Sequence, residues 1–171
     1  MSFETLTVDP LLFFTPRRLD LIVKYWLFYY WHCGKSGVVE SIYLEHIAQR
    51  VGAQLPLDRY LPKACRLFES MHERGYSGEP VPVNKDFQLL DGAHRVACGA
   101  ALGINITINK FPTDHIWPPW DAEWFVEHGM SSVLPSIENT LAELRPGTPP
   151  HAKDVGLVCL KEGDEAGARL T

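Results

Sequence analysis

Residues 89–98 read LLDGAHRVAC, and this stretch decides the fold of the region around it. Two leucines end a predicted strand, Gly92 turns the chain, and a helix follows that Gly103 ends. Free backbone N–H groups at the start of a helix attract anions, and the helix dipole adds to that attraction. The sequence therefore predicts a strand–loop–helix turn that holds a phosphate group.

The residue types in the turn suit phosphate chemistry. Gly92 lets a phosphate approach the backbone closely, and Arg95 can bind phosphate oxygens with two parallel hydrogen bonds. His94 can donate a hydrogen bond or move a proton near neutral pH, and Asp91 can hold His94 or a metal-bound water. The alternative is an ordinary turn in which Asp91 caps the helix and His94 and Arg95 are solvated. The pattern by itself leaves both interpretations open.

The chain before this turn is predicted to be helical. Thr15 and Pro16 resemble a helix start, and a helix is expected from there to about His32. Two more helices are predicted over residues 38–51 and 62–74, with a loop at 54–58 between them.

Short strands surround the turn. They are predicted at residues 81–83, 87–90 and 104–108, with a tight turn at 84–86 and a helix at 94–102. An ordered loop at 112–120 and helices at 121–128 and 132–144 follow. The sequence predicts an α+β fold with a small sheet and flanking helices, in one domain over residues 1–145. Its core is 61–110, its helical N-terminal part 15–52 and its helical C-terminal part 121–145. Residues 146–171 are expected to form a loosely held tail, in which 155–160 could be a strand.

Composition and charge limit the partners and the cellular location that we expect for this chain. The formal net charge is -5 and the basic residues are scattered, so nucleic acid is not the expected partner. The apolar stretch 19–31 is too short to span a bilayer and contains Asp20 and Lys24, which predicts a buried helix. The first residues do not resemble a signal peptide, and the four cysteines form no CxxC pair. A cytoplasmic location is expected.

The DGAHR sequence at 91–95 resembles the ParB/sulfiredoxin superfamily. Further similarity lies in the LFESM helix at 67–71, the Gly75 stop and the PVPV strand at 80–83, so the resemblance covers residues 61–108. The flanking stretches RLDLIVKY at 18–25, YLEHI at 43–47 and WFVEHG at 124–129 are similar to a subgroup found among glycan and natural-product biosynthesis proteins.

The resemblance implies nucleotide binding, with phosphates contacted by Gly92, Ala93, His94 and Arg95. Superfamily activities include sulfinic-acid phosphorylation, phosphorylation of free serine and a CTP-operated switch. Sulfiredoxin has its reactive cysteine immediately before the His-Arg pair, where this chain has Ala93, and the helix-turn-helix of ParB is not seen. The comparison with the serine kinase is therefore favoured, with ATP or ADP as the nucleotide and Mg²⁺ as its companion.

Other candidate residues lie on the predicted helices. A kinase needs a carboxylate to take the acceptor proton. Glu45 is the first candidate and Asp91 the second, with His46 assisting or binding the substrate. The alternative is a surface glutamate beside a half-buried histidine. Lys24 could reach a phosphate and Asp20 a substrate amine or hydroxyl. Because these two residues are four apart on one helix face, a structural ion pair is the favoured alternative.

The aromatic residues and histidines complete the survey. Trp117, Trp120 and Trp124 could stack on a base or substrate, but aromatic side chains more often complete a core, and that is the expectation here. No pattern of histidines and cysteines indicates a structural zinc site.

Three hypotheses follow from these patterns. The first is a nucleotide-dependent phosphotransferase that acts on a small hydroxyl- or amine-bearing metabolite. The second is a nucleotide sensor without catalysis, and the third, less favoured, is a DNA-binding or nuclease module. The sequence identifies neither the acceptor nor the oligomeric state.

Overall fold

The computed structural model describes residues 3–35, 37–52 and 57–144. It shows a mixed α+β fold, as predicted. The strands are β1 (Glu4–Val8), β2 (Val81–Val83) and β3 (Ile106–Lys110). The helices are α1 (Asp20–His32), α2 (Val38–Val51), α3 (Tyr60–Arg74), α4 (Ala93–Leu102), α5 (Ala122–Glu127) and α6 (Leu134–Leu144). Short 3-10 helices cover Pro10–Phe13, Leu57–Arg59 and Ser131–Val133.

The three strands form one sheet in the order β1-β3-β2. β1 runs antiparallel to β3, and β2 runs parallel to it after the crossover through α4. Strand β1 was not predicted, because its residues lie mostly exposed at the edge of the sheet and make a weak apolar signal. β3 begins two residues later than predicted.

The predicted strand at 87–90 is wrong. Only an isolated bridge joins Leu89 to Val83 there. The side chain of Asn84 accepts hydrogen bonds from the backbone N–H groups of Asp86 and Gln88, and Phe87 has a φ of 58°. These two features curl the chain, so an extended strand cannot form.

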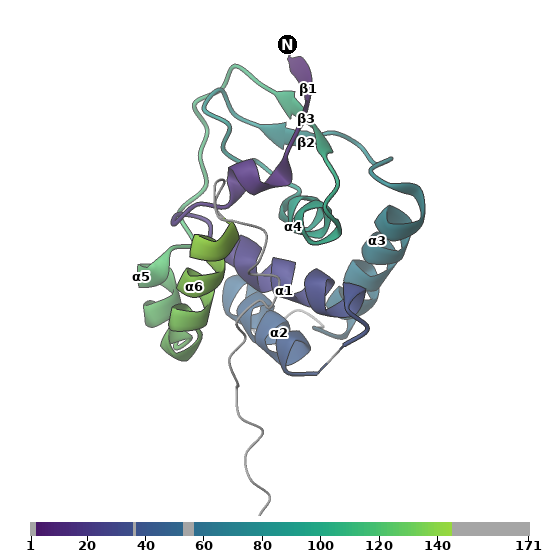
Figure 1. Ribbon diagram of the computed structural model, residues 1–171. Coiled ribbons are helices and arrows are strands. Elements are labelled where there is room, and N and C mark those ends of the chain that lie inside the picture. The colour runs from purple at the N-terminus through teal and green to yellow at the C-terminus, as the bar shows by residue number, and fades with distance from the viewer. Residues whose placement is uncertain (1–2, 36, 53–56, 145–171) are drawn as a thin grey trace, which may run out of the picture.

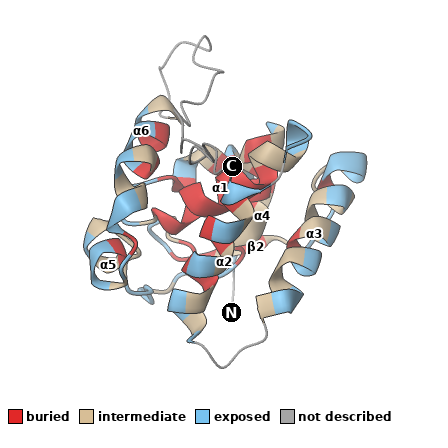
Figure 2. Cartoon of the chain, turned by 90° about the horizontal axis from the view of Figure 1, so that it is seen from below, coloured by how far each residue is buried: buried red, intermediate tan, exposed pale blue. Residues whose placement is uncertain are grey.

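Helix α4 lies against the sheet, and α1 lies beneath α4 (Figure 1). The approach of α4 to the sheet is close, because a Cβ at Gly99 would stand 2.8 Å from the side chain of Ile106. α1 also packs against α2 and α6. Figure 2 shows that the buried residues concentrate on α1 and α4, while α3, α5 and α6 carry exposed outer faces.

Helix α1 is the buried helix that the sequence predicts. Its residues from Asp20 to Phe28 are all buried, as expected for a helix surrounded by protein. It begins at Asp20, four residues after Pro16, because Arg18 pairs with Trp120 in an isolated parallel bridge and holds residues 15–19 out of the helix. In the part of the chain that the structure describes, no helix has the length and apolar character needed to cross a membrane.

The other predicted helices agree with α2, α3, α4, α5 and α6 to within two residues at each end. Most of the predicted loop at 54–58, the tail at 146–171 and the strand at 155–160 lie outside the described residues.

Candidate functional site

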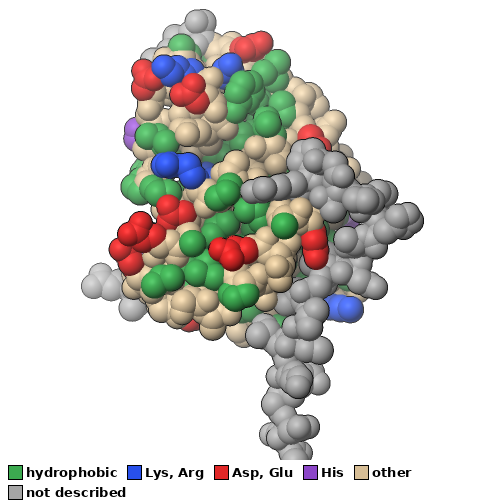
Figure 3. Space-filling view, turned by 60° about the vertical axis from the view of Figure 1, so that its left-hand side comes forward, with side chains coloured by type: hydrophobic (Ala, Val, Ile, Leu, Met, Phe, Trp, Pro, Cys, Tyr) green, Lys and Arg blue, Asp and Glu red, His purple; other side chains and the backbone are tan. Residues whose placement is uncertain are grey.

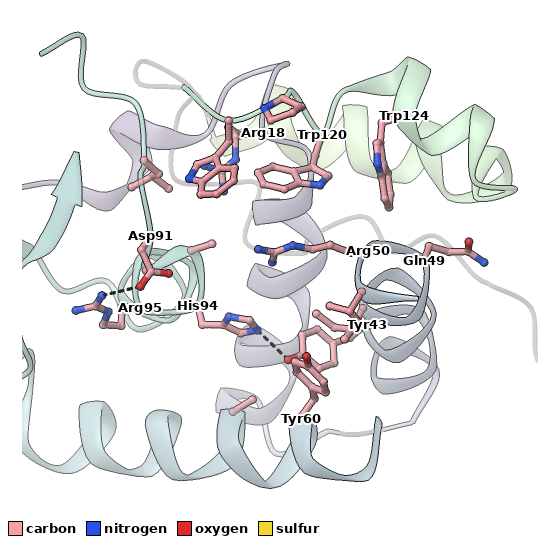
Figure 4. A pocket seen from close by; sticks show the side chains of 18 of the residues that line it. Arg18, Tyr43, Gln49, Arg50, Tyr60, Asp91, His94, Arg95, Trp120 and Trp124 are labelled. Carbon is pink, nitrogen blue, oxygen red and sulfur yellow. Dashed lines mark hydrogen bonds and ion pairs between the residues drawn. The ribbon is translucent and has the colours of Figure 1, made fainter. Parts of the chain in front are cut away.

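The predicted turn opens into a pocket of about 1180 Å³. Ligand pockets are commonly about 300–1,000 Å³, so this one can hold a nucleotide-sized molecule together with a second ligand. Its walls come from the turn before α4, the inner faces of α2 and α3, and the loop that carries Trp117 and Trp120 (Figure 4).

Gly92 shapes the wall of the pocket at the turn. Its φ of 82° is left-handed, and a Cβ would stand 2.9 Å from Nη2 of Arg95 and 3.1 Å from the side chain of Val81. Both the backbone conformation and the space therefore require glycine. Gly92 is the N-cap of α4, and no side chain caps that helix start. The first N–H groups of α4 and the positive end of its dipole thus adjoin the pocket.

Arg95 lines the pocket, but its guanidinium already has partners within the protein. Its Nη1 donates a hydrogen bond to the carbonyl oxygen of Glu79, and its Nη2 lies 4.0 Å from Oδ2 of Asp91. The predicted two-pronged grip on a phosphate would need this guanidinium to leave the Glu79 carbonyl. Asp91 also lines the pocket, and its side chain is 83% exposed.

His94 points into the pocket from the first turn of α4. Its Nε2 lies 2.8 Å from the hydroxyl of Tyr43 on α2. Burial lowers the pKa of His94 to about 3, and the positive charges of Lys24 and Arg50 act in the same direction. The imidazole is therefore neutral near pH 7. It suits hydrogen bonding, whereas the predicted proton transfer near neutral pH does not fit this environment.

Asp20 and Lys24 form the ion pair that was the favoured alternative. Both side chains are fully buried, and Lys24 Nζ lies 2.8 Å from Oδ2 of Asp20. Arg18 binds the same carboxylate through Nε at 2.8 Å and Nη2 at 3.1 Å. Burial raises the pKa of Asp20, but the charges of Lys24 and Arg18 outweigh it and hold the pKa far below the usual value. Neither Asp20 nor Lys24 lines the pocket.

Burial lowers the pKa of Lys24 to about 8, against the opposing charge of Asp20. Its ammonium group already donates to the Asp20 carboxylate and to the Asp20 carbonyl oxygen. The structure thus gives Lys24 a structural partner, Asp20, and leaves it outside the pocket lining.

Glu45 and His46 do not lie in the pocket with Asp91, His94 and Arg95. Glu45 is exposed and lies outside the pocket lining. His46 is fully buried, stacked on Phe125 with ring centroids 5.7 Å apart. Among the described residues neither of its ring nitrogens has a hydrogen-bond partner, and burial holds its pKa well below the usual value. It too lies outside the pocket lining.

Several pocket residues were not found from the sequence. Four cationic side chains line the pocket, and the one carboxylate among the described lining residues is Asp91. The cations are Arg18, Arg50, Lys63 and Arg95. This excess of positive charge stands on a chain whose net charge is -5, so the pocket is suited to anions. Arg95 belongs to the DGAHR turn, and Arg18 begins the RLDLIVKY stretch without having been singled out as a site residue. Arg50 and Lys63 are single basic residues on helices.

The three tryptophans also line the pocket. Trp124 packs against the core as well, as expected, whereas Trp117 and Trp120 are not part of the core packing. Trp117 is 48% exposed, and its Nε1 donates a hydrogen bond of 2.7 Å to the carbonyl oxygen of Leu90. Trp120 carries a guanidinium over its ring from both Arg18 and Arg50. Trp124 stacks on His128 with ring centroids 4.1 Å apart. Together they form an aromatic wall beside the turn.

Within residues 3–144, apart from the gaps at 36 and 53–56, no group of three or more His, Cys, Asp or Glu side chains is placed to hold a metal ion. Comparison with known proteins finds no matching family model, no matching curated protein and no matching solved structure. The pocket itself is therefore the basis for a functional proposal.

Proposed function

We propose that this chain is a nucleotide-dependent phosphotransferase acting on a small hydroxyl- or amine-bearing metabolite in the cytoplasm. One observation carries the proposal: the uncapped start of α4, formed by the left-handed Gly92, opens into a large pocket lined by four cations and one carboxylate. Exposed N–H groups at a helix start together with basic side chains are the usual cradle for a phosphate.

The nucleotide phosphates would lie on the backbone of Gly92, Ala93 and His94. Lys63 and Arg95 line the same pocket and would balance their charge. A Cβ at residue 92 would press on the side chains of Arg95 and Val81, so glycine leaves the Arg95 guanidinium in place beside the turn. Neutral His94 would donate or accept a hydrogen bond, with its ring held by Tyr43. Positioning and charge neutralisation supply most of the rate in phosphoryl transfer.

The aromatic wall suits the base of ATP or ADP, because every nucleobase presents an aromatic face for stacking. Trp117 contacts the turn directly, because its indole N–H donates to the carbonyl oxygen of Leu90, two residues before Gly92. The resemblance of residues 61–108 to the ParB/sulfiredoxin superfamily is a second, sequence-based support for a nucleotide at this turn.

Asp91 replaces Glu45 as the candidate that orients or deprotonates the acceptor. It is the carboxylate that the described part of the pocket presents, whereas Glu45 lies on the surface. Mg²⁺ usually binds proteins through one or two carboxylates together with phosphate oxygens and water. Asp91 would hold such a companion metal, which would supply charge neutralisation for the phosphates.

A second candidate is a nucleotide sensor without catalysis. It is favoured by the surroundings of Asp91, which is largely exposed and lies 4.0 Å from Arg95, and so is poorly placed as a buried base. A DNA-binding role receives less support. On the face shown in Figure 3 the Lys and Arg side chains form no continuous patch and lie among acidic and hydrophobic ones.

Phosphorus NMR separates these candidates. The purified full chain is incubated with ATP, ADP, CTP or GTP and Mg²⁺, with and without a mixture of small metabolites. A phosphotransferase shifts the nucleotide resonances and, with the mixture, produces a new phosphomonoester or phosphoramidate signal. Shifts without a new signal favour the sensor. The absence of any shift at millimolar nucleotide rejects both.

A further inference from the structure

We infer that Arg18, Trp120 and Arg50 form a second anion site, which binds an acidic group on the acceptor. We name these three residues the arginine–tryptophan cluster. That the bound molecule is the acceptor of a phosphate rests on the proposed function. The anion site itself rests on the geometry of the cluster. It makes the acceptor a carboxylate- or phosphate-bearing metabolite.

Arg18 is fixed in place before any ligand binds. Its backbone is held to Trp120, because Leu19 N–H donates to the Trp120 carbonyl at 2.9 Å and Trp120 N–H donates to the Arg17 carbonyl at 3.0 Å. Its guanidinium lies 4.9 Å from the centre of the Trp120 ring and makes two hydrogen bonds to buried Asp20. A guanidinium has five N–H donors, so Arg18 retains donors for a ligand.

Arg50 approaches the same indole from α2. Its guanidinium also lies 4.9 Å from the centre of the Trp120 ring. Within the residues that the structure describes, this ring is the partner recorded for Arg50, and no carboxylate pairs with it. Figure 4 shows its side chain reaching into the pocket, between Trp120 on one side and Tyr43 and Tyr60 on the other.

The charges around the cluster do not balance. Arg18, Arg50 and Lys24 are cationic, and Asp20, which binds Arg18 and Lys24, is the carboxylate among them. Both guanidinium groups lie 4.9 Å from the centre of the same indole ring, and a bound oxyanion would offset this local excess of positive charge. A planar guanidinium fits carboxylate and phosphate oxygens in a two-pronged manner, which gives the chemical class of the ligand.

The cluster is separate from the phosphate-binding turn. In Figure 4, Asp91 from the turn before α4 and His94 from the first turn of α4 lie on one side, while Arg18, Trp120 and Arg50 come from other elements around the pocket. A metabolite held by its acidic group at the cluster can direct its hydroxyl or amine toward a phosphate at the start of α4. This arrangement is the proximity that phosphoryl transfer requires.

The test is calorimetric titration of the full chain with two probes, succinate and inorganic phosphate, each in the absence and in the presence of a non-hydrolysable ATP analogue whose own binding is titrated first. The matched variants are Arg50→Gln and, as a control, Arg66→Gln, an exposed arginine on α3 outside the pocket lining. We expect Arg50→Gln to weaken binding of the preferred probe about tenfold or more, and Arg66→Gln to leave it unchanged. Arg50→Lys should give an intermediate affinity, because lysine keeps the positive charge but lacks the planar pair of N–H donors that binds two oxygens at once.

The preferred probe distinguishes a carboxylate from a phosphate on the acceptor. Equal probe affinities in the wild type and Arg50→Gln would overturn the inference, as would displacement of the probe by the ATP analogue, because the arginines would then serve the nucleotide. Failure of the proposed function looks different. The analogue would not bind at all, while Arg50-dependent binding of the probe would persist and support the anion site.

Discussion

The hydroxyl of Tyr43 lies 2.8 Å from Nε2 of His94, which joins α2 to the first turn of α4 at the edge of the pocket. Tyr43 is fully buried, and burial raises the pKa of its phenol well above the usual value. A protonated phenol and a neutral imidazole thus share one hydrogen bond, which fixes the orientation of the His94 ring.

Tyr43→Phe should reduce the free energy of unfolding by about 1 kcal/mol, because it removes one net hydrogen bond while keeping the ring. Nucleotide affinity should fall severalfold, since the His94 ring loses the group that orients it. Urea unfolding and calorimetry measure the two effects. Tyr30→Phe is the control: Tyr30 is half-buried on α1 and lies outside the pocket lining. Equal effects of the two variants would contradict the orienting role.

Gly92→Ala should weaken nucleotide binding at least tenfold, because the added Cβ would displace the side chains of Arg95 and Val81 and so distort the turn that is proposed to hold the phosphate. The left-handed φ adds about 1 kcal/mol of strain. Gly103→Ala is a close control, since its φ of 68° is also left-handed but no atom lies within 4 Å of the added Cβ. It should show a similar backbone strain in urea unfolding and unchanged nucleotide affinity. Wild-type affinity in Gly92→Ala would remove the basis of the proposed function.

Asp20→Asn should destabilise the protein by about 3 kcal/mol, because it leaves the buried charge of Lys24 and the charge of Arg18 without a carboxylate. Lys24→Met should be milder, about 1 kcal/mol, because Asp20 keeps its two hydrogen bonds to Arg18 and the methionine fills the space. Urea unfolding of both variants tests this order. A larger loss for Lys24→Met would mean that Arg18 does not compensate Asp20.

His46→Leu should leave the free energy of unfolding unchanged or raise it by about 1 kcal/mol. The reason is that both ring nitrogens are buried without a partner among the described residues, and replacing such a group by an apolar one removes a desolvation penalty. Nucleotide affinity should not change. A clear loss of turnover with retained stability would instead support the sequence-based prediction that His46 binds the substrate.

Stability should fall between pH 7.5 and pH 5. His94 and His46 have folded-state pKa values lowered by burial, that of His94 to about 3, whereas an unfolded histidine has a pKa of about 6.5. Below pH 6.5 the unfolded chain therefore binds protons that the folded chain excludes, at up to about 1.4 kcal/mol per pH unit for each histidine. The lowered pKa of Asp20 acts only at more acidic pH, below about 4.

Urea unfolding at pH 7.5, 6 and 5 measures this dependence. His94→Gln should reduce the loss, because one of the two excluded protons disappears. His115→Gln, at an exposed position in the loop after β3, should keep the full loss. A stability that does not change between pH 7.5 and pH 5 would show that the folded protein accepts these protons.

Local sequence was sufficient for most helices and for the turn. Each of these depends on near neighbours: Gly92 supplies a positive φ, and apolar spacing sets the lengths of α2, α3 and α4. Prediction from local sequence failed at β1 and at residues 87–90. β1 needs its partner β3, which lies a hundred residues away, and the side chain of Asn84 curls a stretch whose apolar residues otherwise resemble a strand.

The sequence by itself determined the glycine turn before α4, the buried α1 and the pairing of Asp20 with Lys24, because each depends on residues within a few positions of one another. Only the tertiary structure decided that Arg18, Arg50 and Trp120 meet at one pocket while Glu45 faces away. Those residues come from distant parts of the chain, and which face of a helix looks into a cavity depends on how the helices pack.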